Sequence, residues 1–324
     1  MPRELPNNCL DITYDQSGVI SRTQALSSGV SPDMVRARLR AGHWQRLQWG
    51  VYATFTGEPG REAQLWGALR RAGPCAVLSH YTAAEQWRLT SRQAARIHVT
   101  VPRHKHVWPI PGVVLHRSSR VQEALHFGSL PPRTRIDETT LDLTQVSGTL
   151  DDALAWLAQA CGARLTTAAL LRTAMDRRAR LRWRAELAVA LDDIGDGAHS
   201  ILELRYIRRV ERPHWLPRAR RQVRVVSGQR TRYRDALYAE FGVVVETDGR
   251  VAHPLEERWQ DHHRDNFAAV DGLVTLRYSW TDVTQRACLV ATEVAAVLAR
   301  RGWPGAPRPC SPTCPVRHAT RSAR

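Results

Sequence analysis

Hydrophobic positions near the N-terminus recur at helical spacing and are interrupted by residues that cap helices. Ser21, with Gln24 three residues later, is typical of a capping box and predicts a helix over 22–27. A Ser-Pro pair predicts the start of the next helix, over 31–41, which has one apolar and one basic face. The arginines of the basic face are Arg36, Arg38 and Arg40.

Aromatic and β-branched residues on both sides of Gly50 predict two short strands. With the helices before them, they form the pattern of a winged helix-turn-helix. Trp44 and Tyr52 would pack beneath the strands, and Arg46 would reach a phosphate. The alternative is a small structural helical module whose arginine face is only solvated.

The pattern changes after residue 196, from helices rich in Ala, Leu and Arg to alternating helices and strands. It predicts a helix from Ser200 to about Glu211, strands at 220–227, 232–238 and 243–247, a helix at 255–270, a strand at 273–278 and a closing helix at 284–301. This αβββαβα order predicts a mixed sheet flanked by helices. The expected fold class is α/β (α+β), with an N-terminal winged helix-turn-helix, a mixed middle region and a C-terminal αβββαβ core.

The length of 324 residues favours two or three domains, and 43% hydrophobic residues exclude a wholly disordered chain. The expected segments are 1–57 (winged helix-turn-helix), 58–145 (mixed middle region), 146–196 (helical linker), 197–303 (C-terminal core) and 304–324 (a Pro- and Arg-rich tail without structure).

Charge narrows the class of partner. The chain has 47 Lys and Arg against 31 Asp and Glu, which gives a net charge of +16 and a pI near 10.7. Such a balance favours a polyanion, above all nucleic acid. Lys105 is the one lysine in the sequence. Biased genome composition explains the preference for arginine, but almost no chemistry here can depend on a lysine.

No apolar run approaches the ~18 residues of a membrane span, and the N-terminus lacks the apolar stretch of a signal peptide. We therefore expect a cytoplasmic protein with no membrane partner. Six scattered cysteines in so long a chain predict reduced thiols. Cys310, Cys314 and His318 are residue types that bind zinc, but no fourth ligand lies nearby in the sequence. An unstructured terminus is therefore favoured.

Five histidines of the middle region lack the i,i+4 spacing of a metal site on a helix. They are expected to be structural or surface residues. These histidines are His80, His98, His104, His106 and His116.

The candidate chemistry lies where two of the predicted strands end. If these strands form a hairpin centred on Glu240–Phe241, Asp235 lies directly opposite Glu246. Like charges so placed repel each other, and with Asp248 close by they need a cation. Oxygen ligands with open positions suit Mg²⁺ or Mn²⁺, which can polarise a phosphodiester and activate water.

The first half of the chain carries motifs of a known family. They are Ser21-Arg-Thr-Gln-Ala-Leu26 and Gly50-Val-Tyr52, followed more weakly by Leu78-Ser-His80, Ile97–Pro102, Val113–Arg117, Pro131–Thr134 and Leu141–Leu143. This half resembles the winged-helix N-terminal domain of the AbiEi antitoxins of type IV toxin–antitoxin systems. The resemblance implies DNA binding and autoregulation, with a cognate toxin as a partner; a homodimer is also open.

The segment 197–300 carries a second set of motifs in a fixed order. They are Ser200-x-x-Glu203, Arg234-Asp235, Glu246-Thr-Asp248-Gly249, His253, Asp261, Arg264-Asp265 and Leu273–Arg277. This segment resembles the PD-(D/E)xK restriction-endonuclease-like superfamily, in particular the domain of unknown function related to very-short-patch repair endonucleases. The resemblance implies a metal-dependent endonuclease with Asp235 and Glu246 as metal ligands. It also implies that Glu203 contacts the metal directly or through water.

One position departs from the superfamily pattern, because its lysine is Asp248 here. Activation of water then passes to the metal, to His253 or to an arginine such as Arg250, or the site is inactive. His253 is the best candidate base, since a neutral imidazole accepts a proton near pH 7 and the repair-endonuclease relatives also use histidine.

Each acid also has a structural interpretation. Glu203 is equally explained as a capping residue, and Asp248 with its following glycine as a turn. Asp261 and Asp265 lie one turn apart and fit a solvated helix face better than a metal site.

A basic segment leads into the acidic centre. Between Arg205 and Arg234 the sequence has eleven arginines and one acid, Glu211. Such a segment would bind the phosphate backbone near the site. The candidate DNA contacts outside the predicted recognition helix are Arg46, Arg220, Arg221, Arg232 and Arg234. Two functions stay open: a metal-dependent DNA endonuclease, or a non-catalytic DNA-binding regulator or antitoxin.

Overall fold

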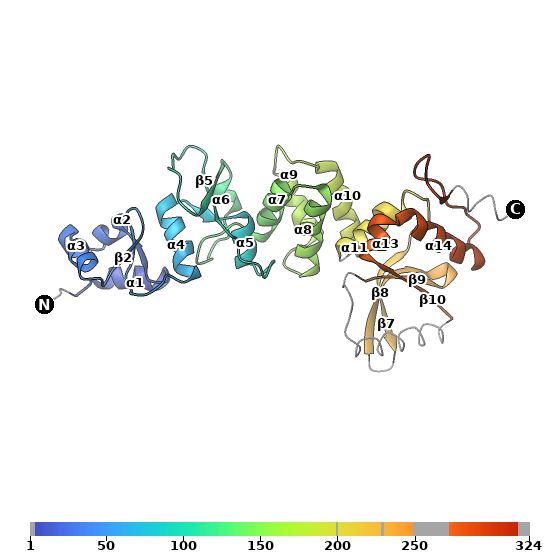
Figure 1. Cartoon of the computed structure of the whole chain (residues 1–324), viewed down its shortest axis with the longest axis horizontal. Helices are drawn as coiled ribbons and strands as arrows, with labels where there is room; N and C mark the ends of the chain where they lie inside the picture. Colours follow the sequence, from blue (N-terminus) through green and yellow to red (C-terminus); the bar gives the residue numbers. More distant parts are fainter. Residues whose placement is uncertain (1–3, 199, 228–229, 249–271, 317–324) are drawn as a thin grey trace. The chain divides into compact units, whose positions relative to one another are not determined.

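The computed structural model describes residues 4–198, 200–227, 230–248 and 272–316 (Figure 1), and for 225–227, 230–232 and 248 it describes only the strand backbone. The chain divides into two units, Met1–Ser147 with Thr173–Arg180 and Gly148–Arg172 with Leu181–Arg324. Helices and three small sheets make up the described part, so the mixed α/β class is confirmed. Within these ranges no helix has the length and apolar character needed to cross a membrane.

The first unit begins with three helices and three short strands. They are α1 (Asn7–Asp15), β1 (Val19–Ser21), α2 (Arg22–Ser27), α3 (Pro32–Arg40), β2 (Gln45–Gln48) and β3 (Val51–Ala53). Two of these helices, α2 and α3, are the ones that the capping residues predict. Ser21 and Gln24 form the predicted capping box of α2, and the Ser31 hydroxyl accepts the Met34 N–H at 3.2 Å. Gly50 joins β2 to β3 with a φ of 70°, in the left-handed region that glycine adopts at no steric cost.

Packing in this part follows the predicted amphipathic pattern. Val35 of α3 is buried, with 1% exposed. Trp44 and Tyr52 are buried beneath the strands, with ring centroids 6.0 Å apart. The sequence missed β1, whose residues pair antiparallel with β3. Three residues are too few to show a period of two, and β1 lacks an aromatic residue such as Tyr52, which marks the equally short β3.

The rest of the first unit is a second small sheet with its helices. Its elements are α4 (Arg61–Ala72), β4 (Val77–Leu78), α5 (His80–Gln86), β5 (Ile97–Pro102), β6 (Val113–Ser118), α6 (Val121–Ala124) and α7 (Ile136–Val146). Strand β5 runs antiparallel to β4 and parallel to β6. Val19 and Val51 from the first sheet share one hydrophobic core with Leu65 and Val99. The segments expected as 1–57 and 58–145 are therefore packed as one body.

The second unit combines helices with a four-stranded sheet. Its elements are α8 (Leu150–Gly162), the first half of α9 (Ala168–Asp176), α10 (Arg184–Gly195), α11 (Ile201–Arg205), the π-helical turn η1 (Tyr206–Glu211), β7 (Arg220–Ser227), β8 (Arg230–Tyr238), the 3₁₀ turn η2 (Ala239–Phe241), β9 (Val243–Asp248), β10 (Val274–Ser279), α13 (Trp280–Gln285) and α14 (Ala287–Arg300). The four strands start and end within two residues of the predicted bounds. The predicted closing helix is α14, and the sequence missed the short helix α13 before it, which ends next to Arg286.

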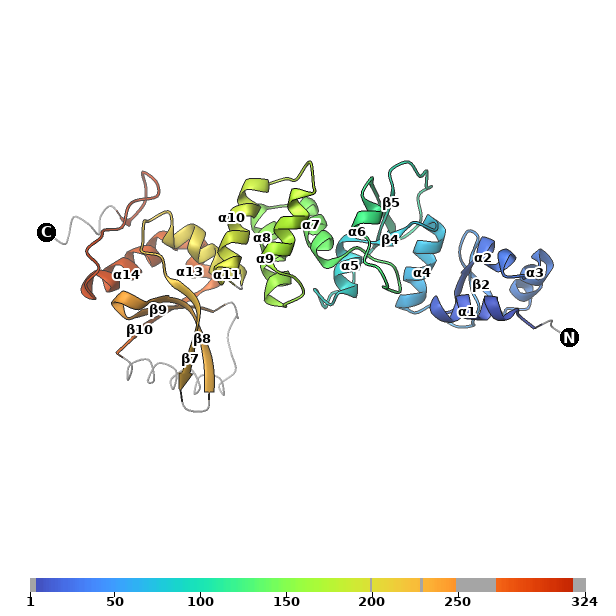
Figure 2. The ribbon, with the colours of Figure 1, turned by 180° about the vertical axis from the view of Figure 1, so that it is seen from behind.

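The sheet of the second unit is mixed, in the order β10-β9-β8-β7, with β10 parallel to β9 and the other neighbours antiparallel. The pairs Ala236–Val245 and Tyr238–Val243 have the predicted hairpin register, which is therefore confirmed. Figure 2 shows α11, α13 and α14 together on one side of this sheet. Their core includes Tyr206 and Leu298.

The C-terminal segment differs from the expected tail. Residues 304–316 contain little regular secondary structure, but Cys314 and Val316 are buried in the core of the second unit, with 3% and 0% exposed. Composition predicts disorder here because proline and arginine dominate, whereas the fold provides an apolar surface that accepts two side chains. Residues 317–324, including His318, lie outside the described part.

Candidate functional site

A row of polar residues crosses the sheet of the second unit at the predicted carboxylate site. Arg277 on β10 pairs with Glu246 on β9 in the parallel register, and their side chains form an ion pair of 3.3 Å. Continuing the β8–β9 register by one step brings Asp235 opposite Glu246. The β7–β8 register brings Gln222 opposite Asp235. These four positions form one line across the sheet, which brings two of the predicted acids next to each other.

Gln222 connects two of the predicted metal ligands. Its Nε2 donates to Oε2 of Glu203 at 3.1 Å and to Oδ1 of Asp235 at 3.3 Å. Glu203 lies on α11 and is buried, with 5% exposed. The φ of Gln222 is 47°, a left-handed conformation that a non-glycine residue adopts only where the surroundings hold it. Nothing in the local sequence pattern distinguishes this glutamine as a residue of the site.

The Asp235 carboxylate lies where β8 and β9 cease to pair. The ladder ends at Ala236–Val245, and Oδ2 of Asp235 accepts the next backbone N–H, that of Thr247, at 2.9 Å. The Thr247 hydroxyl donates to the same oxygen at 3.2 Å. Because both carboxylate oxygens have donors, Asp235 is held in one orientation between the strands.

Some of the predicted residues cannot be placed. His253, Asp261 and Asp265 lie outside the described residues, as do the side chains of Asp248 and Arg232. Among the described residues, two groups of possible metal ligands have all their ligand atoms within 4.8 Å of one another: one consists of a histidine and three cysteines, the other of three histidines. The carboxylates of the row form no such group.

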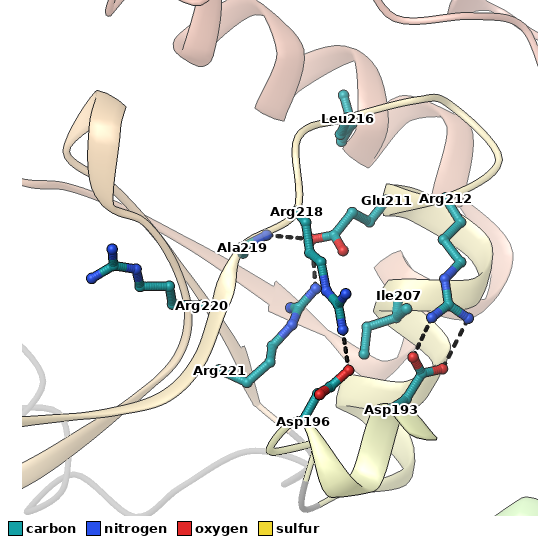
Figure 3. Close-up of a pocket in the computed structure, with 10 residues that line it drawn as sticks. All are labelled: Asp193, Asp196, Ile207, Glu211, Arg212, Leu216, Arg218, Ala219, Arg220 and Arg221. Carbon is teal, nitrogen blue, oxygen red and sulfur yellow. Dashed lines mark hydrogen bonds and ion pairs between the residues drawn. The ribbon is translucent and has the colours of Figure 1, made fainter. Parts of the chain in front are cut away.

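Ion pairs neutralise part of the basic segment before the site. Among the described side chains, five of the eleven arginines form ion pairs: Arg205 and Arg209 with Asp151, Arg212 with Asp193, Arg218 with Asp196, and Arg221 with Glu211. The last three pairs line a pocket of about 580 Å³ (Figure 3). The sequence count found one acid because the other three precede the segment and reach it only in the folded chain.

Two of the predicted DNA contacts are buried. The side chain of Arg221 is 5% exposed and holds Glu211, which also accepts the Ala219 N–H at 3.3 Å and the Tyr238 hydroxyl at 3.1 Å. Burial raises the pKa of Glu211 despite the opposing charge of Arg221. Arg234 is 9% exposed. Both side chains are thus largely buried, whereas Arg220 is exposed. The assignment of Arg221 and Arg234 to a DNA surface stays a prediction.

The predicted recognition helix presents its basic face. Arg36 and Arg40 of α3 are exposed, Arg38 is half-buried, and Arg36 pairs with Asp33 one turn earlier. Arg46 of β2 is exposed as well, and its guanidinium lies 5.3 Å from the ring centroid of Trp49. Trp49 itself is 75% exposed. The Arg46 guanidinium and the Trp49 ring therefore lie close together on the hairpin of β2 and β3.

Three of the middle-region histidines lie together in the first unit. The rings of His80 and His116 stack with centroids 3.6 Å apart, and Nδ1 of His98 lies 3.0 Å from Nε2 of His116. Burial lowers the pKa of all three, that of His98 to about 4, so the rings are largely neutral at pH 7. Spacing along one helix could not reveal this cluster, because α5, β5 and β6 contribute one ring each.

No protein-family profile matches this chain, and a search of curated proteins found no match to it.

Proposed function

We propose that this protein binds DNA and cleaves it with a divalent-metal-dependent site on the sheet of its second unit. The observation that carries the proposal is the Gln222 amide, which joins Glu203 of a helix to Asp235 of a strand. Glu246 lies next in the same row. Bringing acids from separate segments close together lowers the stability of the fold, because like charges repel. Such a cluster therefore favours a functional role over a structural one.

The order of elements supports a restriction-endonuclease-like core. Helix α11 is followed by three antiparallel strands, and β10 then lies parallel to β9. In the proposed core, the acid before the end of β8 and the acid at the end of β9 are the two metal ligands. The proposal of a restriction-endonuclease-like core rests on this order of elements and on the motifs in the sequence.

The donor atoms fit a hard cation. Carboxylate oxygens are the ligands that Mg²⁺ and Mn²⁺ prefer, and no thiol or imidazole takes part in the row. The N–H groups of the Gln222 amide stand between Glu203 and Asp235 and donate a hydrogen bond to each carboxylate. The residues that would hold the metal are Asp235 and Glu246, assisted by Glu203. A bound Mg²⁺ or Mn²⁺ supplies charge neutralisation at a phosphate and lowers the pKa of a water ligand.

The residues around the metal position have separate roles in the proposal. Asp248 occupies the position of the superfamily lysine and would be a further oxygen ligand. His253 would accept a proton from the attacking water. Arg277, beside Glu246, remains charged at any physiological pH and therefore cannot be the base, but it can stabilise negative charge on a phosphate.

The first unit would supply the affinity for DNA. The order α1-β1-α2-α3-β2-β3 with a three-stranded sheet is that of a winged helix, and α3 would be its recognition helix. Arg36, Arg38 and Arg40 would face the major groove, and Arg46 with Trp49 would face the backbone beside it.

A second candidate function is a non-catalytic DNA-binding regulator or antitoxin. The ion pair between Glu246 and Arg277 favours it, because an arginine already neutralises an acid that a metal would need. In this case the sheet of the second unit is only a binding or partner surface, and all function rests on the first unit.

Incubation with plasmid and with single-stranded DNA in Mg²⁺ or Mn²⁺ tests the proposal, with Asp235→Ala alongside. The wild type is expected to cut at least one substrate when metal is present, and Asp235→Ala is expected to cut none. Equal cleavage by both proteins contradicts the assigned site. If neither protein cuts and both retain salt-sensitive DNA binding, the regulator is correct.

A further inference from the structure

Four side chains that can bind metal converge in the second unit, away from the carboxylate row. His214 lies between η1 and β7, Cys288 is the second residue of α14, and Cys310 and Cys314 belong to the C-terminal segment. Their ligand atoms all lie within 4.8 Å of one another. We propose that these residues bind one Zn²⁺ as a closed Cys₃His site that anchors the C-terminal segment to the core.

The separations fit a tetrahedral metal site. The Cys288 and Cys310 sulfurs are 3.5 Å apart, and the Cys314 sulfur is 3.5 Å from Nε2 of His214. A zinc ion with Zn–S near 2.3 Å and Zn–N near 2.0 Å holds its ligand atoms about 3.5–3.8 Å apart. A disulfide would require about 2.05 Å, and all six cysteines are free thiols.

His214 is oriented as a metal-binding histidine. It is fully buried, and its Nδ1 lies 2.8 Å from the carbonyl oxygen of Val210. A carbonyl can only accept, so Nδ1 carries the proton and Nε2 presents its lone pair to the thiol of Cys314. An imidazole fixed through its other nitrogen is the arrangement that supports metal-bound histidines.

The donor set selects the metal and its role. Three sulfurs and one imidazole suit Zn²⁺ and exclude Mg²⁺ or Ca²⁺, which take oxygen ligands. Four protein ligands leave no open position for water, so the site is structural. It is independent of the proposed cleavage site and stands whether or not the protein cuts DNA.

The position of the ligands explains why a metal would be useful here. Residues 304–316 contain little helix or strand, yet Val316 is fully buried and Trp303 packs on the same core. A segment that forms no helix or strand of its own is held weakly against the core, because few contacts offset the conformational entropy that it loses on folding. A zinc ion would tie it to α14 and to the loop before β7.

Zinc content is the direct test. The full-length, untagged protein is purified without oxygen and with a phosphine reductant, loaded with Zn²⁺, desalted and measured by mass spectrometry of the metal. We expect about one zinc per chain in the wild type and in Cys75→Ser, a thiol outside the group. Cys310→Ser and His214→Asn are expected to lose most of it. Unchanged zinc in both variants, or none in the wild type, overturns the proposal.

A second measurement uses only the wild type, in case the variants do not fold. Replacement of zinc by Co²⁺ is expected to give strong visible bands of tetrahedral cobalt and thiolate-to-cobalt charge transfer. Chelation is expected to speed hydrogen exchange in residues 304–316. Weak octahedral bands without charge transfer, or a Cys288–Cys310 disulfide in the reduced preparation, refute the site.

Discussion

Substitution of Arg221 distinguishes two roles for this residue, a contact on a basic binding surface or one half of a buried ion pair. Arg221→Met removes the positive charge and keeps most of the aliphatic side chain. Its partner Glu211 would keep two donors, the Ala219 N–H and the Tyr238 hydroxyl. Removing one partner of a buried pair costs roughly 3–5 kcal/mol of unfolding free energy. Because two donors remain, we expect the lower end, about 3 kcal/mol, or on the order of a hundredfold in the unfolding equilibrium.

The loss of stability in Arg221→Met is expected to grow as the pH rises. The pKa of Glu211 is already raised by burial in the wild type, and it rises further without Arg221. The folded variant then holds a proton that the unfolded chain releases, so its free energy of unfolding falls as pH rises above about 4.5. The difference between Arg221→Met and the wild type is therefore larger at pH 8 than at pH 5.

Hydrogen exchange on peptides of β7 and β8 measures the change in the free energy of unfolding in the full chain, because it reports on the second unit separately from the first. The exposed Arg220→Met is the matched control and should change stability by less than about 0.5 kcal/mol. The double variant Glu211→Gln with Arg221→Met should recover most of the loss, since no buried charge remains. Wild-type stability in Arg221→Met, with weakened DNA binding instead, would refute the assignment of this arginine to the core.

Two further predictions concern the first unit. Changing Arg40 and Arg46 together to alanine should weaken duplex binding in fluorescence anisotropy. It should also reduce the slope of log affinity against log salt by about 1, since Arg46 is the proposed backbone contact and each lost phosphate contact removes about 0.9. The exposed Arg92→Ala should leave the slope unchanged, and a slope that is also unchanged in the double variant would contradict the recognition surface. Burial lowers the pKa of His98 to about 4 in the folded chain. As pH drops below about 6.5, the unfolded chain therefore binds a proton that the folded chain does not, and the free energy of unfolding falls. His98→Phe should therefore flatten the fall of the melting temperature between pH 7 and 5, and an unaltered fall would show that His98 does not cause it.

Local signals predicted much of the fold. Ser21 and Gln24 cap α2 because the capping box needs residues only three positions apart. The strand bounds of the second unit follow from short runs with β-branched and aromatic residues, of which Val243–Val245 is fully apolar, with turns between them. The hairpin register around Glu240–Phe241 was predictable because a short connection leaves few ways to pair two strands.

Contacts between distant segments could not be predicted in the same way. Gln222 is one polar residue in an arginine-rich strand until folding places it against Glu203 and Asp235. The cysteines of the C-terminal segment lacked a fourth ligand in the sequence, whereas the structure brings His214 and Cys288 to them. A local window contains neither partner, because helices and strands that are far apart in the chain supply them.

The rate of Mg²⁺-dependent plasmid nicking by Asp235→Asn, relative to the wild type, tests the central claim most directly. Asparagine keeps the size of the side chain but removes the charge that a cation needs. Glu240→Gln, which removes an exposed carboxylate from the turn between β8 and β9, is the matched control. We predict a fall of at least about a hundredfold for Asp235→Asn, as expected for loss of a metal ligand or its outer-shell support, and no change for Glu240→Gln. Equal rates for Asp235→Asn and the wild type would contradict the account.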